Sequence, residues 1–161
     1  MEIDNSPLRS LPPKFFELLG VVSVWFVLLE NLMKDVISEL TSTDLKTKRL
    51  LASKSFSELL KILKKILLQK INNDELATNE FIRIYEQLKT VAWSRNECMH
   101  SVFFLDDDNN IKRFKYTSRI DATYFEEESK DLESMEKLVR DIMFAFRELN
   151  NFIKRIIGKF P

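Results

Sequence analysis

An arginine, an amide and a histidine lie close together near position 100 of this chain. Arg95, Asn96 and His100 fall within six residues, and His100 is the only histidine among 161 residues. RNA is cleaved without a metal when its own 2′-hydroxyl attacks the adjacent phosphate, which requires a general base, a general acid and positive charge near the transition state. Histidine titrates near neutral pH and suits both proton transfers, whereas arginine grips phosphate oxygens bidentately. With Asn96 orienting a phosphate oxygen or the imidazole, the three residues indicate RNA or phosphate chemistry.

The segment that carries these residues reads as a long helix that starts after Asp74. Its apolar stripe has helical spacing and consists of Phe81, Ile84, Tyr85, Leu88, Val91, Ala92, Arg95 and Met99. Arg95 therefore occupies a position that periodicity gives to the core, and a charge there needs a partner or a cleft. The alternative interpretation is structural, with Arg95 in a buried ion pair and His100 beside the negative end of the helix dipole.

The rest of the chain favours long helices. Only two glycines and four prolines occur, and three of the prolines lie between Pro7 and Pro13. A composition of 45% hydrophobic and 31% charged residues is typical of a soluble globular domain. We expect one domain over residues 1–161, with residues 1–11 as an N-terminal extension.

The predicted fold class is all-α, an up-and-down bundle of four to five helices with a small β-hairpin insert near residues 101–117. Two apolar runs flank the polar segment 106–110, which predicts the hairpin. The expected helices run from Pro12 or Pro13 to about Leu40, over Asp44–Ala52, from the Ser55–Glu58 capping box to about Asn72–Asn73, from Asp74 past Arg95, and from a start between Tyr124 and Ser129 to a C-cap at Gly158.

The first expected helix is apolar on almost every side. A helix of this kind must be buried all round, which is difficult in a small domain. We therefore expect part of it to contact a second copy of the chain in a homodimer. A two-fold dimer would also bring two copies of His100 to one site, so that one could act as acid and the other as base.

Basic residues concentrate in one part of a chain whose net charge is zero. Between Asp44 and Lys70 there are eight basic residues against two acidic ones, so any RNA contact is expected to be local. The candidate RNA-binding residues are Lys46, Lys48, Arg49, Lys61, Lys64 and Lys65. Because the stretch shows no set of stacked aromatics, the alternative is the solvated face of amphipathic helices.

The other polar candidates are weaker. Glu30, isolated on the first helix, could pair with Arg95 or line the cleft, or it could face solvent. The acidic segment 106–108 lacks the ligand spacing, glycine and terminal glutamate of a calcium loop. One cysteine, Cys98, and one histidine cannot form a structural zinc site or a disulfide, so we expect no metal and no cofactor.

The sequence also favours a cytoplasmic protein. Its single cysteine fits a reducing compartment, and Glu2 and Asp4 stand where a secretory signal would have basic residues. The nearly apolar run Leu18–Leu29 has 12 residues and would span about 18 Å, which is short of a bilayer core of about 30 Å.

The pattern Arg95-Asn96-x-x-x-His100, late in a long helix of an all-helical chain, resembles the HEPN superfamily (higher eukaryotes and prokaryotes nucleotide-binding domains). Many HEPN members are metal-independent endoribonucleases whose site is shared by two copies. The resemblance implies RNA cleavage that leaves a 2′,3′-cyclic phosphate, in a toxin or an antiviral defence effector silenced by a nucleotidyltransferase-like antitoxin partner. The alternative is a catalytically inactive HEPN-like dimer that serves as a binding or scaffold module for a nucleotide or a protein.

Overall fold

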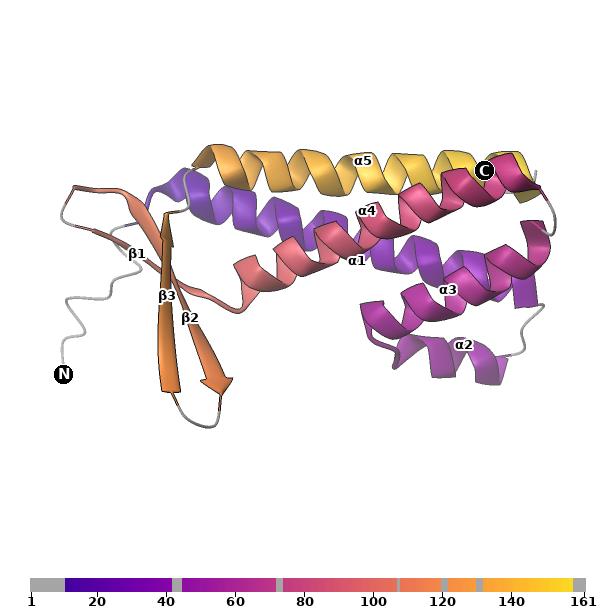
Figure 1. The fold of residues 1–161 in the computed structure, drawn as a ribbon, viewed down its shortest axis with the longest axis horizontal. Helices are drawn as coiled ribbons and strands as arrows, with labels where there is room; N and C mark the ends of the chain where they lie inside the picture. The colour runs from indigo at the N-terminus through magenta and orange to yellow at the C-terminus, as the bar shows by residue number, and fades with distance from the viewer. Residues whose placement is uncertain are drawn as a thin grey trace.

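The computed structural model describes residues 11–41, 45–71, 74–106, 108–119, 122–129 and 132–157. The elements in chain order are α1 (Pro13–Thr41), α2 (Leu45–Ala52), α3 (Phe56–Ile71), α4 (Glu75–Met99), β1 (Val102–Leu105), β2 (Ile111–Arg119), β3 (Ala122–Ser129) and α5 (Leu132–Ile157). The predicted helical bundle with a β insert is confirmed (Figure 1). The expected N-terminal extension and the C-cap at Gly158 fall outside the described residues, apart from Leu11.

The helices pack lengthwise, and the sheet lies at one end of the bundle. Figure 1 shows α1 and α5 side by side along most of their length, with α4 crossing α1 and returning in the opposite direction. The short α2 and α3 pack at the end of the bundle away from the sheet. Because α4 runs toward the sheet, opposite to α1, and α5 runs back from the sheet end, α5 and α1 run in the same direction. The C-terminal end of α4 is therefore placed close to the sheet.

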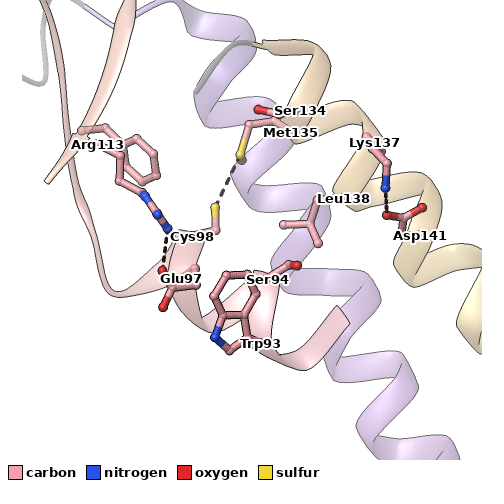
Figure 2. A pocket seen from close by; sticks show the side chains of 11 residues that line it. Trp93, Ser94, Glu97, Cys98, Arg113, Ser134, Met135, Lys137, Leu138 and Asp141 are labelled. Atoms are coloured by element: carbon pink, nitrogen blue, oxygen red, sulfur yellow. Dashed lines mark hydrogen bonds and ion pairs between the residues drawn. The ribbon is translucent and has the colours of Figure 1, made fainter. Parts of the chain in front are cut away.

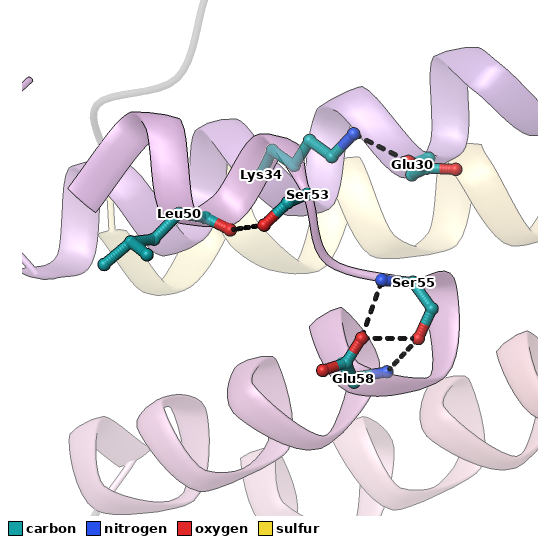
Figure 3. Close-up of polar contacts among 6 residues, drawn as sticks. All are labelled: Glu30, Lys34, Leu50, Ser53, Ser55 and Glu58. Carbon is teal, nitrogen blue, oxygen red and sulfur yellow. Dashed lines mark hydrogen bonds and ion pairs between the residues drawn. The ribbon is translucent and has the colours of Figure 1, made fainter. Parts of the chain in front are cut away.

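Local sequence signals set the helix starts. In Figure 3 the Ser55 backbone N–H donates to a Glu58 carboxylate oxygen at 2.9 Å, and the Ser55 hydroxyl lies 2.8 Å from the same oxygen. This is the predicted capping box, and α3 ends at Ile71 as expected. At the start of α4 the Asp74 carboxylate accepts from the Ala77 N–H at 2.9 Å. These short-range contacts explain why the helix boundaries were readable from sequence.

One face of α1 forms the centre of the core. Its buried residues recur every three or four positions and are Phe15, Leu18, Val22, Phe26, Leu29, Met33, Val36 and Ile37. They pack with buried residues of α3, α4 and α5, including Leu63, Phe81 and Phe152. Another face of α1 stays exposed within the protomer, and its large apolar residues are Phe16, Val24, Val27 and Leu28. The all-round burial expected for this helix is therefore incomplete in one copy of the chain.

The helix α1 is longer than the apolar run that the sequence suggested. It has 29 residues, and its most apolar 18-residue window has a mean hydropathy of 1.8. By length and composition alone this is enough to cross a membrane. A core helix of a soluble protein passes the same test, and α1 buries one face against its neighbours.

The β insert is larger than the predicted hairpin. The hairpin itself is confirmed, since β1 pairs antiparallel with β2 and Leu105 stands opposite Ile111. A third strand, β3, then pairs antiparallel with β2 and gives the order β1-β2-β3. It covers most of the range in which the last helix was expected to start, so that helix begins later, at Leu132. The acidic β3 lies in register with the basic β2, a long-range pairing that helix periodicity does not detect.

The acidic loop of the hairpin has a local structural role. The Asp106 carboxylate accepts hydrogen bonds from the backbone N–H groups of Asp108 at 3.0 Å and Asn110 at 2.8 Å. These bonds, chiefly that from Asn110, lower the pKa of Asp106. Asn109 takes up a left-handed φ of 61°, which asparagine tolerates better than most residues. Asp106 therefore stabilises the turn.

Candidate functional site

Arg95 lies on α4 with its guanidinium over an aromatic ring of α1. Its Cζ is 4.8 Å from the centroid of the Phe26 ring, and its Nη1 donates to Oδ1 of Asn96 at 3.1 Å. Its Nε is buried without a hydrogen-bond partner, and no carboxylate lies within ion-pair distance of Arg95 in the described part of the chain. The predicted position in the apolar stripe is thus explained by a cation–π contact, and the positive charge is not neutralised by an acid.

His100 stands at the end of α4. Its backbone N–H donates to the Asn96 carbonyl at 3.0 Å, and its side chain is exposed. Within the described residues no hydrogen bond joins the imidazole to Arg95 or Asn96. The neighbouring Met99 contacts α1, where its Sδ lies 3.7 Å from the Ser23 hydroxyl. The structure therefore brings Arg95 and Asn96 into contact and presents His100 to solvent one turn away.

A buried ion pair inside the motif was not predicted. Arg113 of β2 donates through Nη1 to the Glu97 carboxylate at 2.8 Å, and the two side chains are only 5% and 11% exposed (Figure 2). The pair ties the last turn of α4 to the sheet and so fixes the helix end that carries Asn96 and His100. The alternation of the strand gave little signal for a buried Arg113, since it shares a side with Lys115, and its partner on α4 could not be identified from spacing.

Glu30 does not pair with Arg95. Its carboxylate forms an ion pair with Lys34, one turn further along α1, at 2.6 Å (Figure 3). A glutamate four residues before a lysine is a favourable arrangement on a helix, and it outcompetes a long-range partner. Of the alternatives predicted for Glu30, the ion pair with Arg95 is therefore not the one found.

The predicted basic residues separate into two groups. Lys46 and Lys48 belong to α2, where their side chains lie outside the described part of the structure, and Arg49 is exposed at the end of α2. On α3, Lys65 is exposed, whereas Lys64 places its Nζ 4.3 Å from the centroid of the Tyr85 ring on α4. Lys61 lines a groove between the same two helices.

This groove brings lysines and aromatic rings together. It has a volume of about 360 Å³, and we call it the Trp93 groove; its lining residues are Phe56, Ser57, Leu60, Lys61, Tyr85, Lys89, Ala92, Trp93 and Asn96. The basic stretch alone did not reveal this set of residues, because α3 supplies Phe56 and Lys61 while α4 supplies Tyr85 and Trp93. Asn96 links the groove to the Arg95 site.

A second cavity lies on the other side of Trp93, between α4, the sheet and α5. Figure 2 shows this cavity, which has a volume of about 220 Å³. Its charged lining residues occur as two pairs, Glu97 with Arg113 and Lys137 with Asp141 at 2.5 Å. The buried Cys98 thiol packs against Met135, with 3.5 Å between the sulfur atoms. We call it the sheet-side cavity.

Comparison with protein-family models, with curated proteins and with solved structures found no match to this chain. The geometry of the site is therefore the basis for the functional proposal.

Proposed function

We propose that this chain is a HEPN-like endoribonuclease that works in the cytoplasm as a homodimer and cleaves RNA without a metal. The observation that carries the proposal is the end of α4. There Arg95, with no acidic partner in the described residues, contacts Asn96, and His100 is exposed one turn away. A cation, an amide and an imidazole on one helix end are the groups that 2′-hydroxyl transesterification needs.

In the proposed reaction the 2′-oxygen of the substrate attacks the adjacent phosphorus atom. One His100 accepts the 2′-hydroxyl proton, and the other donates a proton to the departing 5′-oxygen. The products are a 2′,3′-cyclic phosphate and a free 5′-hydroxyl. Arg95 stabilises the negative charge that builds up on the phosphate oxygens, and Asn96 orients the phosphate.

The exposed face of α1 supports the dimer. Val24 is 60% exposed and Val27 is 53% exposed, and large apolar residues rarely gather on a surface that contacts only water. The end of α4 packs beside this face, because Met99 contacts Ser23, which adjoins Val24, while Arg95 lies over Phe26 on the buried face. Two copies that associate through this face would place their two α4 ends beside one interface. Such an arrangement would supply both histidines.

The resemblance to HEPN proteins extends the proposal to biology. By analogy, the chain would act as a toxin or an antiviral defence effector, and a nucleotidyltransferase-like antitoxin would be its partner. The cleavage chemistry itself depends on Arg95, Asn96 and His100.

Cleavage of RNA in excess EDTA tests the proposal. The purified dimer is incubated with a mixture of single-stranded and structured RNA, and the product ends are analysed. We expect cyclic phosphate ends from the wild type and a loss of roughly 100-fold or more in His100→Ala and in Arg95→Ala. Arg147→Ala removes an exposed arginine of α5 and serves as the matched control, with activity unchanged. The thermal midpoint of His100→Ala should stay close to that of the wild type, because the side chain is exposed.

A charge on the α1 face tests the composite site. We expect Val24→Asp to sediment as a monomer and to lose cleavage, because a carboxylate would be buried in the interface. Leu76→Asp is the control, since Leu76 is 84% exposed in the first turn of α4, far along that helix from His100. Full activity of a monomeric Val24→Asp protein would rule out the shared site. Intact RNA with a well-folded wild-type dimer would instead assign the binding or scaffold module.

A further inference from the structure

We propose that the Trp93 groove binds a single-stranded segment of the RNA substrate, with a base stacked on Trp93 and a neighbouring phosphate held by Lys61. This inference deepens the proposed ribonuclease function and rests on it for the direction in which the strand runs, toward Asn96. It names a substrate class, unpaired RNA, for a site that the motif residues alone do not define.

Trp93 provides the open aromatic face. Its side chain is 66% exposed, although the same residue lines both the groove and the sheet-side cavity. The Tyr85 ring is already engaged by two ammonium groups, Lys64 at 4.3 Å and Lys89 at 5.7 Å from its centroid. A base can therefore stack on Trp93, while Tyr85 holds positive charge at the groove. Stacking of this kind requires an unpaired base, which favours single strands over duplex RNA.

The charge of the groove suits phosphate. Its lining residues include Lys61 and Lys89 and, within the described chain, no carboxylate. Lys61 makes no ion pair in that part of the chain, so its ammonium group is available to a ligand. Lys89 is held by Glu86 at 2.7 Å, and this hydrogen bond raises the pKa of Lys89. Glu86 does not line the groove, so the principal charge that faces a ligand is positive.

Asn96 connects the groove to the proposed reaction. It lines the groove three residues after Trp93, which is close to one helical turn, and its Oδ1 accepts from Arg95 at 3.1 Å. A strand whose base stacks on Trp93 therefore extends along α4 toward Asn96, Arg95 and His100. The volume of about 360 Å³ lies within the range of about 300–1,000 Å³ that small ligands occupy.

Tryptophan fluorescence measures this binding directly, because the chain has two tryptophans. Trp25→Phe leaves Trp93 as the only one, and Trp25 packs edge-on against Phe146 on α5, away from the groove residues. The probe is a 2′-O-methyl uridine hexamer, which cannot be cleaved because its attacking oxygen is blocked. An abasic hexamer with the same phosphates is the control ligand. If Trp25→Phe misfolds, the difference between wild type and Trp93→Phe gives the same readout.

We expect the uridine hexamer to quench Trp93 emission and the abasic hexamer to leave it unchanged. Trp93→Ala should weaken binding about five-fold or more, from the loss of one stacked base. Lys61→Ala should weaken binding and lower the salt slope by about 0.7, the value for one phosphate contact on a single strand. Lys70→Ala, an exposed lysine of α3 outside the groove, should change neither quantity.

Three results would overturn the inference. The first is an unchanged Trp93 emission while the anisotropy of a labelled hexamer shows binding, and the second is an equal loss of affinity in Lys61→Ala and Lys70→Ala. The third is displacement of the hexamer by a hexaglutamate peptide of equal affinity, which would assign an acidic protein partner. Quenching by the hexamer without RNA cleavage would leave the groove in place and remove the ribonuclease proposal. Cleavage without quenching would support the ribonuclease proposal and remove the groove proposal.

Discussion

Trp93 lies between the sheet-side cavity and the Trp93 groove, and the charged residues of these two sites are arranged in nearly opposite ways. On the sheet side, Glu97 binds Arg113 and Asp141 binds Lys137, so each charge is matched within the protein. In the groove, Lys61 has no carboxylate partner among the described residues, and Lys89 has one that lies outside the groove. The Glu97–Arg113 pair holds α4 and the sheet together, whereas charges left unmatched are available to a ligand. The comparison assigns stability to the sheet side and binding to the groove side.

The position of α4 explains how one helix serves both sides. Glu97 and Cys98 point to the sheet and α5, while Asn96 and Trp93 line the groove. Neighbouring residues on a helix differ by about 100° in direction, so adjacent positions reach different surfaces. The buried pair therefore fixes the helix end whose other face carries Arg95 and Asn96.

The largest expected effect is the loss of the buried pair. Glu97→Ala leaves the Arg113 charge in a buried setting, and we expect the free energy of unfolding to fall by about 3–5 kcal/mol. Chemical denaturation measures it. Asp141→Ala breaks a pair whose side chains are 43% and 69% exposed, and it should cost less than about 1 kcal/mol. Equal losses in the two variants would contradict the assignment of stability to the buried Glu97–Arg113 pair.

A carboxylate introduced into the Trp93 groove should match its positive charge, as the carboxylates of the sheet-side cavity do there. Ser57 lines the groove in the first turn of α3, where an acidic residue also favours the helix dipole. We expect Ser57→Glu to keep the fold and to weaken hexamer binding by about 1 kcal/mol, or about five-fold, through repulsion of phosphate. Ser57→Ala removes the hydroxyl without adding charge and should bind as the wild type does. Unchanged affinity in Ser57→Glu, measured by anisotropy, would show that phosphates do not enter the groove.

The parts of the fold that depend on short-range signals were predictable. The Ser55–Glu58 capping box, the start of α4 after Asp74 and the polar hairpin loop were predicted, and each depends on contacts within four residues. The third strand was missed because its evidence is its pairing with β2, not its own pattern. Contacts within a few residues can be predicted from one sequence, whereas a partner that lies elsewhere in the chain cannot.

The same division holds for the candidate site. Periodicity placed Arg95 in the apolar stripe of its helix, and the structure gives it Phe26 as a neighbour. The spacing did not show which residue contacts Arg95. Glu30 was a candidate, but its carboxylate pairs with Lys34. The groove was missed for a similar reason, since its lysine and its tryptophan come from different helices. Glu97 lies within the motif and was not a predicted site residue, but its buried ion pair with Arg113 holds the end of α4 in place.

The smallest expected effect concerns Glu58, an acid that adjoins the groove in sequence. Glu58 adjoins Ser57, yet its carboxylate is committed to Lys54 and Ser55, and these bonds, led by the one from Lys54, lower its pKa to about 2. A carboxyl whose pKa is lower in the folded state stabilises the protein above its unfolded pKa, and that contribution is lost as the pH falls through the folded value. We therefore expect the stability contributed by Glu58 to be constant at neutral pH and to decline between about pH 4.5 and about pH 2. A carboxylate NMR titration should give a midpoint near 2, and Glu58→Gln should remove the pH dependence of stability that this residue contributes. A midpoint near the ordinary value would mean that Glu58 is not held in the capping box and is free to neutralise Lys61. The difference in charge between the Trp93 groove and the sheet-side cavity would then be smaller.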